Sequence, residues 1–178
     1  MDETVYGFIS SFESPGVTQV MIFISFLGGA TFLIALGVIL SLLLGIKNKY
    51  YIDSFFILAN LTGAWVLNAL LKAIFQRPRP IVTHLARAGG YSYPSGHSMI
   101  SMAFYGFVAY TIGRTIKDIR HRFIFVSLLI LLPIVIGISR IYLGVHFASD
   151  VIGGVLAGAA CLGAFIVFRR LVHHFRPL

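Results

Sequence analysis

Long apolar stretches without a charged residue constrain the fold of this chain more than any other feature of its sequence. A helix needs about 20 apolar residues to cross a hydrocarbon core of about 30 Å. Five stretches free of Asp, Glu, Lys and Arg come close to or exceed that length: residues 20–46, 54–71, 95–113, 123–139 and 151–168. Extended into their flanks, they predict spans near 20–46, 54–76, 95–113, 123–139 and 147–168. We therefore expect an all-α fold, a membrane-embedded bundle of about five transmembrane helices.

The composition agrees with a membrane protein built as one domain. Hydrophobic residues make up 58% of the chain and charged residues 11%, whereas a soluble domain is about 25% charged. The mean hydropathy of +0.91 points the same way. A length of 178 residues suits one domain, so residues 1–178 are expected to form a single unit. The one cysteine, Cys161, lies in an apolar run, where we expect it only to pack.

The residues before the first span are expected to lie along the membrane surface. Apolar side chains recur there at helical spacing among polar neighbours, and Pro15 then breaks the pattern. This predicts a short amphipathic helix over residues 3–13, within an interfacial segment 1–19. A disordered terminus is the alternative. A cleavable signal peptide is not expected, because no basic residue precedes the first span and its apolar run is too long.

The distribution of basic residues predicts the orientation of the chain. The formal charge of +8 could indicate either nucleic acid or anionic lipid as a partner. Loops retained in the cytoplasm carry an excess of Lys and Arg. Five spans divide these residues into a set of nine, Lys47, Lys49, Arg114, Lys117, Arg120, Arg122, Arg169, Arg170 and Arg176, and a set of five, Lys72, Arg77, Arg79, Arg87 and Arg140. The larger set is expected inside with the C-terminus, so topology and anionic lipid explain the charge and no nucleic acid partner is expected.

Three polar clusters lie at span ends that this topology assigns to the outer face. The first is KAIFQRPRP at residues 72–80, the second is PSGH at residues 94–97, and the third is SRIYLGVHFASD at residues 139–150. Because all three reach the same membrane face, they are expected to converge on one site.

The third cluster contains a candidate nucleophile. If the chain is helical from about Val145, His146 and Asp150 lie one turn apart on one helix face. A carboxylate bonded to one ring nitrogen fixes the tautomer and leaves the other nitrogen free and more basic, which prepares an imidazole for nucleophilic attack. Considered alone, this pair is better explained as a helix cap beside an interfacial histidine. Arg140 favours the functional interpretation, because a guanidinium at a membrane edge is suited to hold phosphate oxygens.

The second cluster adds an anion site and a second histidine. Pro94 suits a helix entry, and the backbone amides of Ser95 and Gly96 are then expected in the first turn, where free N–H groups and the helix dipole attract an anion. An ordinary cap with an interfacial His97 is the alternative. Two histidines on opposite sides of an anion can take different roles: His146 would attack as the neutral base, and His97 would donate a proton as the cation.

The first cluster supplies positive charge. Lys72 lies near the end of its helix, and Pro78 and Pro80 hold Arg77 and Arg79 in an extended turn. Snorkelling side chains at a positive flank would be the usual explanation. Positive flanks belong on the inner face, however, so basic residues here indicate a bound anion.

Together, the clusters resemble the tripartite signature of the type 2 phosphatidic acid phosphatase (PAP2) superfamily. The matching positions are Lys72 with Arg79 and Pro80, then Pro94, Ser95, Gly96 and His97, then Ser139 and Arg140 with His146 and Asp150. The resemblance covers residues 72–150 and implies a core shared with vanadate-dependent haloperoxidases. It also implies a lipid phosphatase that needs no metal or other cofactor. Typical bacterial members have six spans, so the count of five plus a surface helix departs from the family pattern.

The resemblance also implies a role for each matched residue. His146 would attack phosphorus to form a phosphohistidine, Asp150 would orient it, and His97 would protonate the leaving oxygen and then activate water. The phosphate oxygens would be held by Lys72, Arg79, Arg140 and the amides of Ser95 and Gly96. A two-metal mechanism is not expected, because such sites need several carboxylates and only Asp150 lies near the clusters.

The resemblance leaves the substrate open among phosphatidylglycerol phosphate, undecaprenyl diphosphate, the 1-phosphate of lipid A and phosphatidic acid. The outer loop 81–93 is too short for a large lid, so a lipid could enter sideways, with Arg77, His84 and Arg87 as candidate headgroup contacts. The implied location is the inner membrane, with the site on the periplasmic face. Two other classes remain: a protein that binds or transports a phospholipid without cleaving it, and a haloperoxidase.

Overall fold

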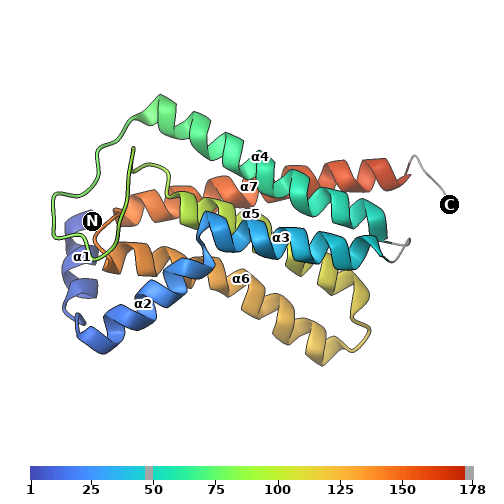
Figure 1. Ribbon diagram of the computed structural model, residues 1–178, viewed down its shortest axis with the longest axis horizontal. Coiled ribbons are helices and arrows are strands. Elements are labelled where there is room, and N and C mark those ends of the chain that lie inside the picture. The colour runs from blue at the N-terminus through green and yellow to red at the C-terminus, as the bar shows by residue number, and fades with distance from the viewer. Residues whose placement is uncertain (47–49, 175–178) are drawn as a thin grey trace.

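The computed structural model describes residues 1–46 and 50–174, and this part of the chain is helical with no strand. Seven helices follow one another: α1 (Asp2–Ser10), α2 (Pro15–Leu27), α3 (Ala30–Gly45), α4 (Tyr51–Phe75), α5 (Gly96–Thr115), α6 (Ile119–Tyr142) and α7 (Ala148–His174). The all-α prediction is confirmed. Lys47, Lys49 and Arg176, from the predicted cytoplasmic set, lie outside the described residues. Figure 1 shows an elongated bundle with α1 and the segment between α4 and α5 at one end.

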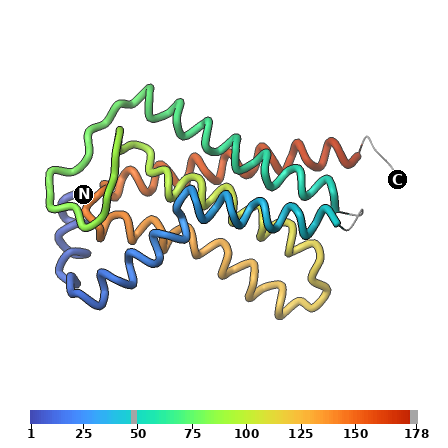
Figure 2. Tube along the Cα trace, in the orientation of Figure 1, coloured from blue at the N-terminus to red at the C-terminus, as the bar shows by residue number. Residues whose placement is uncertain are grey.

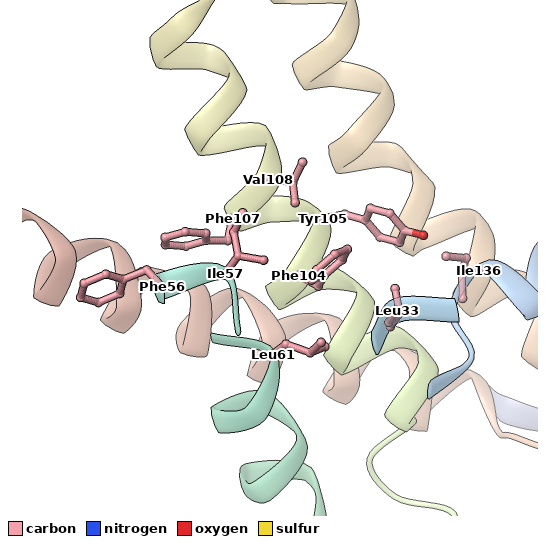
Figure 3. Close-up of a cluster of buried hydrophobic side chains, with 9 residues drawn as sticks. All are labelled: Leu33, Phe56, Ile57, Leu61, Phe104, Tyr105, Phe107, Val108 and Ile136. Carbon is pink, nitrogen blue, oxygen red and sulfur yellow. The ribbon is translucent and has the colours of Figure 1, made fainter. Parts of the chain in front are cut away.

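The central helix of the bundle is α5. It packs against α3, α4, α6 and α7, and most of its residues are buried. The main apolar core surrounds it (Figure 3) and consists of Leu33, Phe56, Ile57, Leu61, Phe104, Tyr105, Phe107, Val108 and Ile136. Because α5 carries His97 in its first turn, packing around α5 also positions one of the candidate catalytic groups.

Small residues allow α7 to approach α5 closely. A Cβ on Gly154 would lie 2.7 Å from the carbonyl oxygen of Ser95, and a Cβ on Gly158 would lie 2.4 Å from that of Met99. In a bilayer, lipid is as apolar as the side chains, so this close packing is a principal source of helix association. Gly163, further along the same helix, has nothing within 4 Å of its Cβ position.

The predicted first span, 20–46, is wrong as a continuous helix. It consists of α2 and α3, which are bent by 48° relative to each other. A Cβ on Gly28, at the break, would lie 2.5 Å from Cγ2 of Ile136 on α6, so the close approach requires glycine. The interrupted helix leaves the Leu27 carbonyl oxygen free, and it accepts a 2.7 Å hydrogen bond from the Tyr105 hydroxyl on α5.

The segment 1–19, predicted to be interfacial, is divided between α1 and the start of α2. Pro15 begins α2 instead of only ending the pattern before it, because Ser14 caps the helix by accepting a hydrogen bond from the Val17 amide and proline is favourable at a first helical position. The short helix predicted over 3–13 is present as α1. Its inner face packs on the ends of α6 and α7 through Val5, Tyr6 and Ile9 against Ile141, Ala148 and Val151.

A membrane-embedded bundle is confirmed, and the count of five spans remains a prediction. In the described part of the chain, α4, α6 and α7 are each long and apolar enough to cross a membrane, and the bent α2–α3 pair could form a fourth crossing. Large apolar side chains project outward from the three long helices, including Phe55, Trp65, Phe123, Leu128, Leu156 and Phe168. The predicted span 95–113 corresponds to α5, which other helices shield from its surroundings.

A buried ion pair joins α4 and α7 at the end of the bundle opposite α1. Arg169 donates hydrogen bonds to both carboxylate oxygens of Asp53, at 2.8 and 3.2 Å. Both residues are buried, so the pair satisfies charges that would otherwise be costly there. Arg169, which the sequence assigned only to the cytoplasmic set, therefore has a structural partner inside the bundle.

Candidate active site

The three polar clusters meet at the α1 end of the bundle. The chain trace in Figure 2 brings the segment after α4 beside the loop that joins α6 to α7. Arg79 of the first cluster donates a 2.7 Å hydrogen bond to the Val145 carbonyl oxygen of the third, and the Ser95 amide of the second donates a 3.0 Å hydrogen bond to the Asp150 carbonyl oxygen of the third. The predicted convergence of the clusters is therefore present in the structure, from elements far apart in the sequence.

His146 and Asp150 are paired, although not on one helix as predicted. α7 begins at Ala148, so His146 lies in the preceding loop. Its Nδ1 is still 3.3 Å from Oδ2 of Asp150, and the same oxygen accepts a 2.9 Å hydrogen bond from the Phe147 amide. That bond folds the loop back over the first turn of α7. The two side chains are almost completely buried, with exposed fractions of 3% and 0%.

Two neighbours define the state of the His146 imidazole. The carboxylate beside Nδ1 favours a proton there, and Arg79, whose guanidinium can only donate, has its Nη1 3.4 Å from Nε2. Burial lowers the pKa of His146 to about 4 against the opposing hydrogen bond from Asp150, and the charges of Arg79 and Arg140 lower it further. The imidazole is therefore neutral at pH 7, with a lone pair on Nε2.

Ser92 belongs to this site, and sequence reasoning missed it. Its hydroxyl donates a hydrogen bond to Oδ2 of Asp150 and lies 3.3 Å from Nδ1 of His146. The residue is completely buried, and its backbone amide donates a 2.7 Å hydrogen bond to the Arg77 carbonyl. A serine in a loop, outside all three clusters, carries no signal that would have distinguished it in the sequence.

Lys72 and Arg79 flank the histidine through the segment 89–92. The Lys72 ammonium donates to the carbonyl oxygens of Tyr91 and Ser92. Arg79 donates to the carbonyl oxygens of Gly89, at 2.7 Å, and of Val145, also at 2.7 Å. These contacts hold both basic groups next to the His146 loop.

Arg140 contributes a buried cation from the end of α6. Its Nη1 donates a 2.5 Å hydrogen bond to the Ser25 hydroxyl on α2, and its side chain is buried. Its Nε is buried and, among the described residues, has no hydrogen-bond partner. A buried guanidinium nitrogen that lacks an acceptor is costly, so this atom points to a bound anion.

Ser95 caps α5, but its amide is not available to a phosphate as predicted. The Ser95 N–H donates a 3.0 Å hydrogen bond to the carbonyl oxygen of Asp150, which joins the second cluster to the third. Its hydroxyl accepts from the Ser98 amide at 3.4 Å. Gly96 is the first residue of α5, where backbone amides have no carbonyl in a preceding turn. A Cβ on Gly96 would lie 3.0 Å from Oδ1 of Asn68, so space is tight there.

His97 and Asn68 border an apolar cavity of about 430 Å³. The cavity extends from the first turn of α5 between α3 and α4, where it is lined by Leu33, Ile34, Leu58, Leu61 and Trp65. Ile34, Leu58 and Trp65 are exposed on the outer surface of the bundle. The cavity therefore joins the polar site to the sides of helices that are apolar enough to face lipid.

The three candidate headgroup contacts have different surroundings. Arg77 uses both terminal nitrogens within the protein, so it is not available to a headgroup in this arrangement: Nη1 donates to Oδ1 of Asp150 at 2.8 Å, and Nη2 donates to Asp2 at 2.9 Å. His84 is exposed, with its Nε2 3.0 Å from the Pro80 carbonyl oxygen. Arg87 is exposed in the same segment.

The fold and the site define a class of protein: a membrane-embedded helical enzyme in which a histidine–carboxylate pair lies among cations from α4, α6 and the segment after α4. The chain belongs to the PAP2 superfamily, whose family model matches residues 32–173. The family prediction is thus confirmed, and so is the prediction of a lipid phosphatase at the level of the class.

Two curated relatives carry names of this class. Phosphatidylglycerophosphatase B of Bacillus subtilis (strain 168) is 30% identical over 176 residues, which cover 98% of this chain and 86% of the relative. Putative undecaprenyl-diphosphatase YbjG of Escherichia coli (strain K12) is 35% identical over 107 residues, 56% of this chain and 49% of the relative.

Two crystal structures are similar to the fold. The first transmembrane PAP2 type phosphatidylglycerolphosphate phosphatase from Bacillus subtilis has a TM-score of 0.90 at 30% identity, over 98% of this chain and 87% of that one. Aquifex aeolicus LpxE has a TM-score of 0.75 at 24% identity, over 93% of this chain and 94% of that one, and its likeness concerns the fold alone.

Proposed function

We propose that this protein removes the terminal phosphate of a membrane lipid phosphate or diphosphate through a phosphohistidine on His146. The observation that carries the proposal is the His146 imidazole itself, held between Asp150 at Nδ1 and Arg79 at Nε2. A neutral imidazole whose Nε2 lone pair faces the cations is suited to attack phosphorus once the substrate phosphate takes over the contact with Arg79.

The reaction has two steps. Nε2 of His146 forms a bond to phosphorus while the bond from phosphorus to the lipid oxygen breaks, and His97 donates a proton to that oxygen. Water then attacks the phosphohistidine, giving its proton to His97, and inorganic phosphate leaves. Both histidines end in their starting protonation states.

Cations and one backbone amide stabilise the charge that develops on the phosphoryl oxygens. Lys72, Arg79 and Arg140 provide the cations, and the amide of Gly96 points from the start of α5. Preorganised donors of this kind contribute on the order of 3 kcal/mol each. Ser95 contributes by fixing the start of α5 against Asp150 and not by its own amide.

The apolar cavity supports a lipid as the substrate. A lipid tail seated between α3 and α4 would leave its phosphate next to His97, at the inner end of the cavity. Entry from the side of the bundle agrees with the short segment 81–93, which offers no large lid. The names of the two relatives support phosphatidylglycerol phosphate and undecaprenyl diphosphate as candidates. The 1-phosphate of lipid A and phosphatidic acid have the same reacting group and belong to the same proposal.

The proposed setting is a multi-pass protein of the inner membrane with its site on the extracytoplasmic face. In this arrangement α5 crosses as a fifth, internal span and the bent α2–α3 pair crosses as one, while α1 lies along the outer surface. The described basic residues at the opposite end of the bundle, among them Arg114, Lys117 and Arg170, then lie on the cytoplasmic side, as loop charges favour.

The decisive experiment compares His146→Ala with His173→Ala, a matched change at an exposed histidine at the opposite end of α7. Purified proteins are assayed for phosphate release from a panel of lipid phosphates and for lipid binding. Loss of the nucleophile is expected to lower release by at least about 10³-fold while binding persists, and His173→Ala should behave as the wild type. Unchanged release by His146→Ala would end the proposal. Retention of radiolabelled phosphate by His97→Ala, in an acid-labile form, would identify the intermediate.

A further inference from the structure

The N-terminal helix reaches the catalytic pair through a chain of charged contacts. One carboxylate oxygen of Asp2 accepts hydrogen bonds from Arg77, at 2.9 Å, and from the Ser149 hydroxyl, at 2.7 Å. The other accepts the Ser149 backbone amide at 2.9 Å. Arg77 in turn donates a 2.8 Å hydrogen bond from Nη1 to Oδ1 of Asp150. We call these contacts among Asp2, Arg77, Ser149 and Asp150 the N-terminal clamp.

The clamp restrains the Asp150 carboxylate on the side that His146 does not use. Oδ2 of Asp150 is occupied by Ser92, His146 and the Phe147 amide, whereas Oδ1 is held by Arg77. A carboxylate bonded at both oxygens cannot rotate about its last bond without breaking one set of contacts. Arg77 therefore determines the orientation in which Asp150 meets the imidazole.

Arg77 is itself held on two sides. Its guanidinium lies over the Phe147 ring, 4.1 Å from the ring centroid, and its Nη1 also donates to the Ser149 hydroxyl at 2.7 Å. The side chains of Arg77 and Asp2 are 32% and 20% exposed, so water competes with the contacts only in part. Burial raises the pKa of Asp2, but hydrogen bonds from Ser149 and Arg77 outweigh it and lower that pKa, so Asp2 is ionised at neutral pH.

The helix α1 presents Asp2 at this place by packing. Val5, Tyr6 and Ile9 lie against the apolar ends of α6 and α7, which turns the first residue of α1 toward the start of α7. Asp2 and Tyr6 also border a cavity of about 290 Å³ that His146 lines. An element at the very start of the chain is thus part of the wall of the active site.

We propose that Asp2 and Arg77 are positioning residues of the active site: Asp2, from α1, holds Arg77, and Arg77 holds Asp150 in the orientation that directs His146. This inference rests on the proposed function, in which His146 is the nucleophile. Neither residue touches the phosphate.

Asp2 and Arg77 carry opposite charges, so replacing one or the other should shift the pKa of His146 in opposite directions. Arg77→Gln removes a positive charge from Asp150, which then attracts the His146 proton more strongly, so the pKa of His146 rises. Asp2→Asn leaves the charge of Arg77 uncompensated, so the pKa of His146 falls. A contact that only held the fold together would not move this pKa in two directions. The other charged groups that face the pair are Lys72 of α4, Arg79 of the following segment, His97 of α5 and Arg140 of α6.

The test uses the full chain in detergent micelles, with phosphatidylglycerol phosphate as the probe. The variants are Asp2→Asn, Arg77→Gln and the conservative changes Asp2→Glu and Arg77→Lys, with Glu13→Gln as the matched control for loss of a carboxylate in the same terminal segment. Loss of one charge-assisted hydrogen bond is expected to lower kcat by about 10- to 100-fold, with KM unchanged. The conservative variants should recover part of the activity.

Two further measurements do not depend on turnover. The first is NMR titration of the His146 imidazole in histidine-labelled protein. The second is hydrogen exchange at the Ser149 amide, which Asp2→Asn should accelerate and Glu13→Gln should not. If the wild type releases no phosphate from any lipid but the His146 pKa moves as stated, the proposed function fails and the coupling stands. The inference is overturned if Asp2→Asn matches Glu13→Gln in kcat, if only KM changes, or if the His146 pKa is the same in all variants.

Discussion

At the scale of single residues, the chemistry of His146 depends on burial among charged groups. The imidazole presents a lone pair at Nε2 because Asp150 lies beside Nδ1 and favours the proton there, and it stays neutral because burial opposes a second positive charge beside Arg79. Ser92 helps to hold this arrangement, because its hydroxyl bonds to the Asp150 carboxylate and lies next to the His146 ring. Three side chains from two loops and one helix thus define the state of one atom, Nε2.

The pH dependence of turnover follows from this state. Because the pKa of His146 is lowered from 6.5 to about 4, the imidazole remains neutral and nucleophilic down to about pH 4. We expect the acidic limb of kcat/KM near pH 4 and not near 6.5. The unfolded chain takes up this proton between pH 6.5 and 4 and the folded chain does not, so stability should fall as the pH is lowered through that window.

The measurement is a pH profile of kcat/KM for a lipid monophosphate and for a lipid diphosphate. If ionisation of the substrate causes the acidic limb, its pH will differ between the two lipids. If ionisation of His146 causes it, its pH will be the same for both. A limb near 6.5 with both lipids would contradict the assigned state of the imidazole.

At the scale of elements, the distance between α5 and α7 decides whether the two histidines can act together. α5 carries His97, and α7 carries Asp150 and is preceded by His146. The two helices meet where Gly154 and Gly158 leave room for the backbone of α5. The same close contact permits the Ser95 amide to bond to the Asp150 carbonyl oxygen.

Gly158→Ala should separate these helices. Its Cβ would meet the carbonyl oxygen of Met99 at 2.4 Å, a backbone atom that cannot move aside alone. We expect a loss of about 1–3 kcal/mol in the free energy of unfolding and a lower kcat, because His97 shifts relative to His146. Gly163→Ala, in the same helix with open space around its Cβ position, is the control and should gain up to about 1 kcal/mol from helix propensity. Thermal unfolding in detergent and phosphate release measure both effects, and equal behaviour of the two variants would refute the role of Gly158.

At the scale of the whole molecule, the two ends of the bundle carry different groups of charged residues. The α1 end gathers cations around the two histidines, while the opposite end closes α4 against α7 through the buried pair of Asp53 and Arg169. The exposed basic residues beyond that end, such as Lys117, agree with a cytoplasmic face.

Cysteine labelling tests this orientation. In intact cells, a membrane-impermeant maleimide should react with Arg87→Cys, which lies in the exposed segment near the site, and with Lys117→Cys only after the membrane is opened. Cys161 is buried, so it should contribute little background. The reverse pattern of labelling would invert the proposed topology.

Chelation tests the chemistry of the site as a whole. In the described part of the chain, no group of three or more His, Cys, Asp or Glu side chains is arranged to hold a metal ion, whereas Lys72, Arg79 and Arg140 can neutralise a phosphate. Phosphate release is therefore expected to persist in EDTA. Complete loss of activity on chelation, restored by a divalent ion, would require a metal in the mechanism.

The sequence by itself determined the class of fold and, through its resemblance to the PAP2 superfamily, the proposed reacting groups. Charge-free stretches of about 20 residues leave helices as the only structure that satisfies the backbone in lipid, and His97, Arg140, His146 and Asp150 match the family signature, which implies phosphoryl transfer. These features depend on residue type and local periodicity, which a sequence displays directly.

Only the tertiary structure decided which groups meet. The break at Gly28 arises from close approach to Ile136 of α6, and Ser92, Ser25 and Asp2 join the site through contacts with residues 50 or more positions away. Sequence spacing also suggested the Ser95 amide as a phosphate donor, but a carbonyl group of α7 occupies it. Partners of this kind are set by the packing of one helix against another, and no local pattern in the chain encodes them.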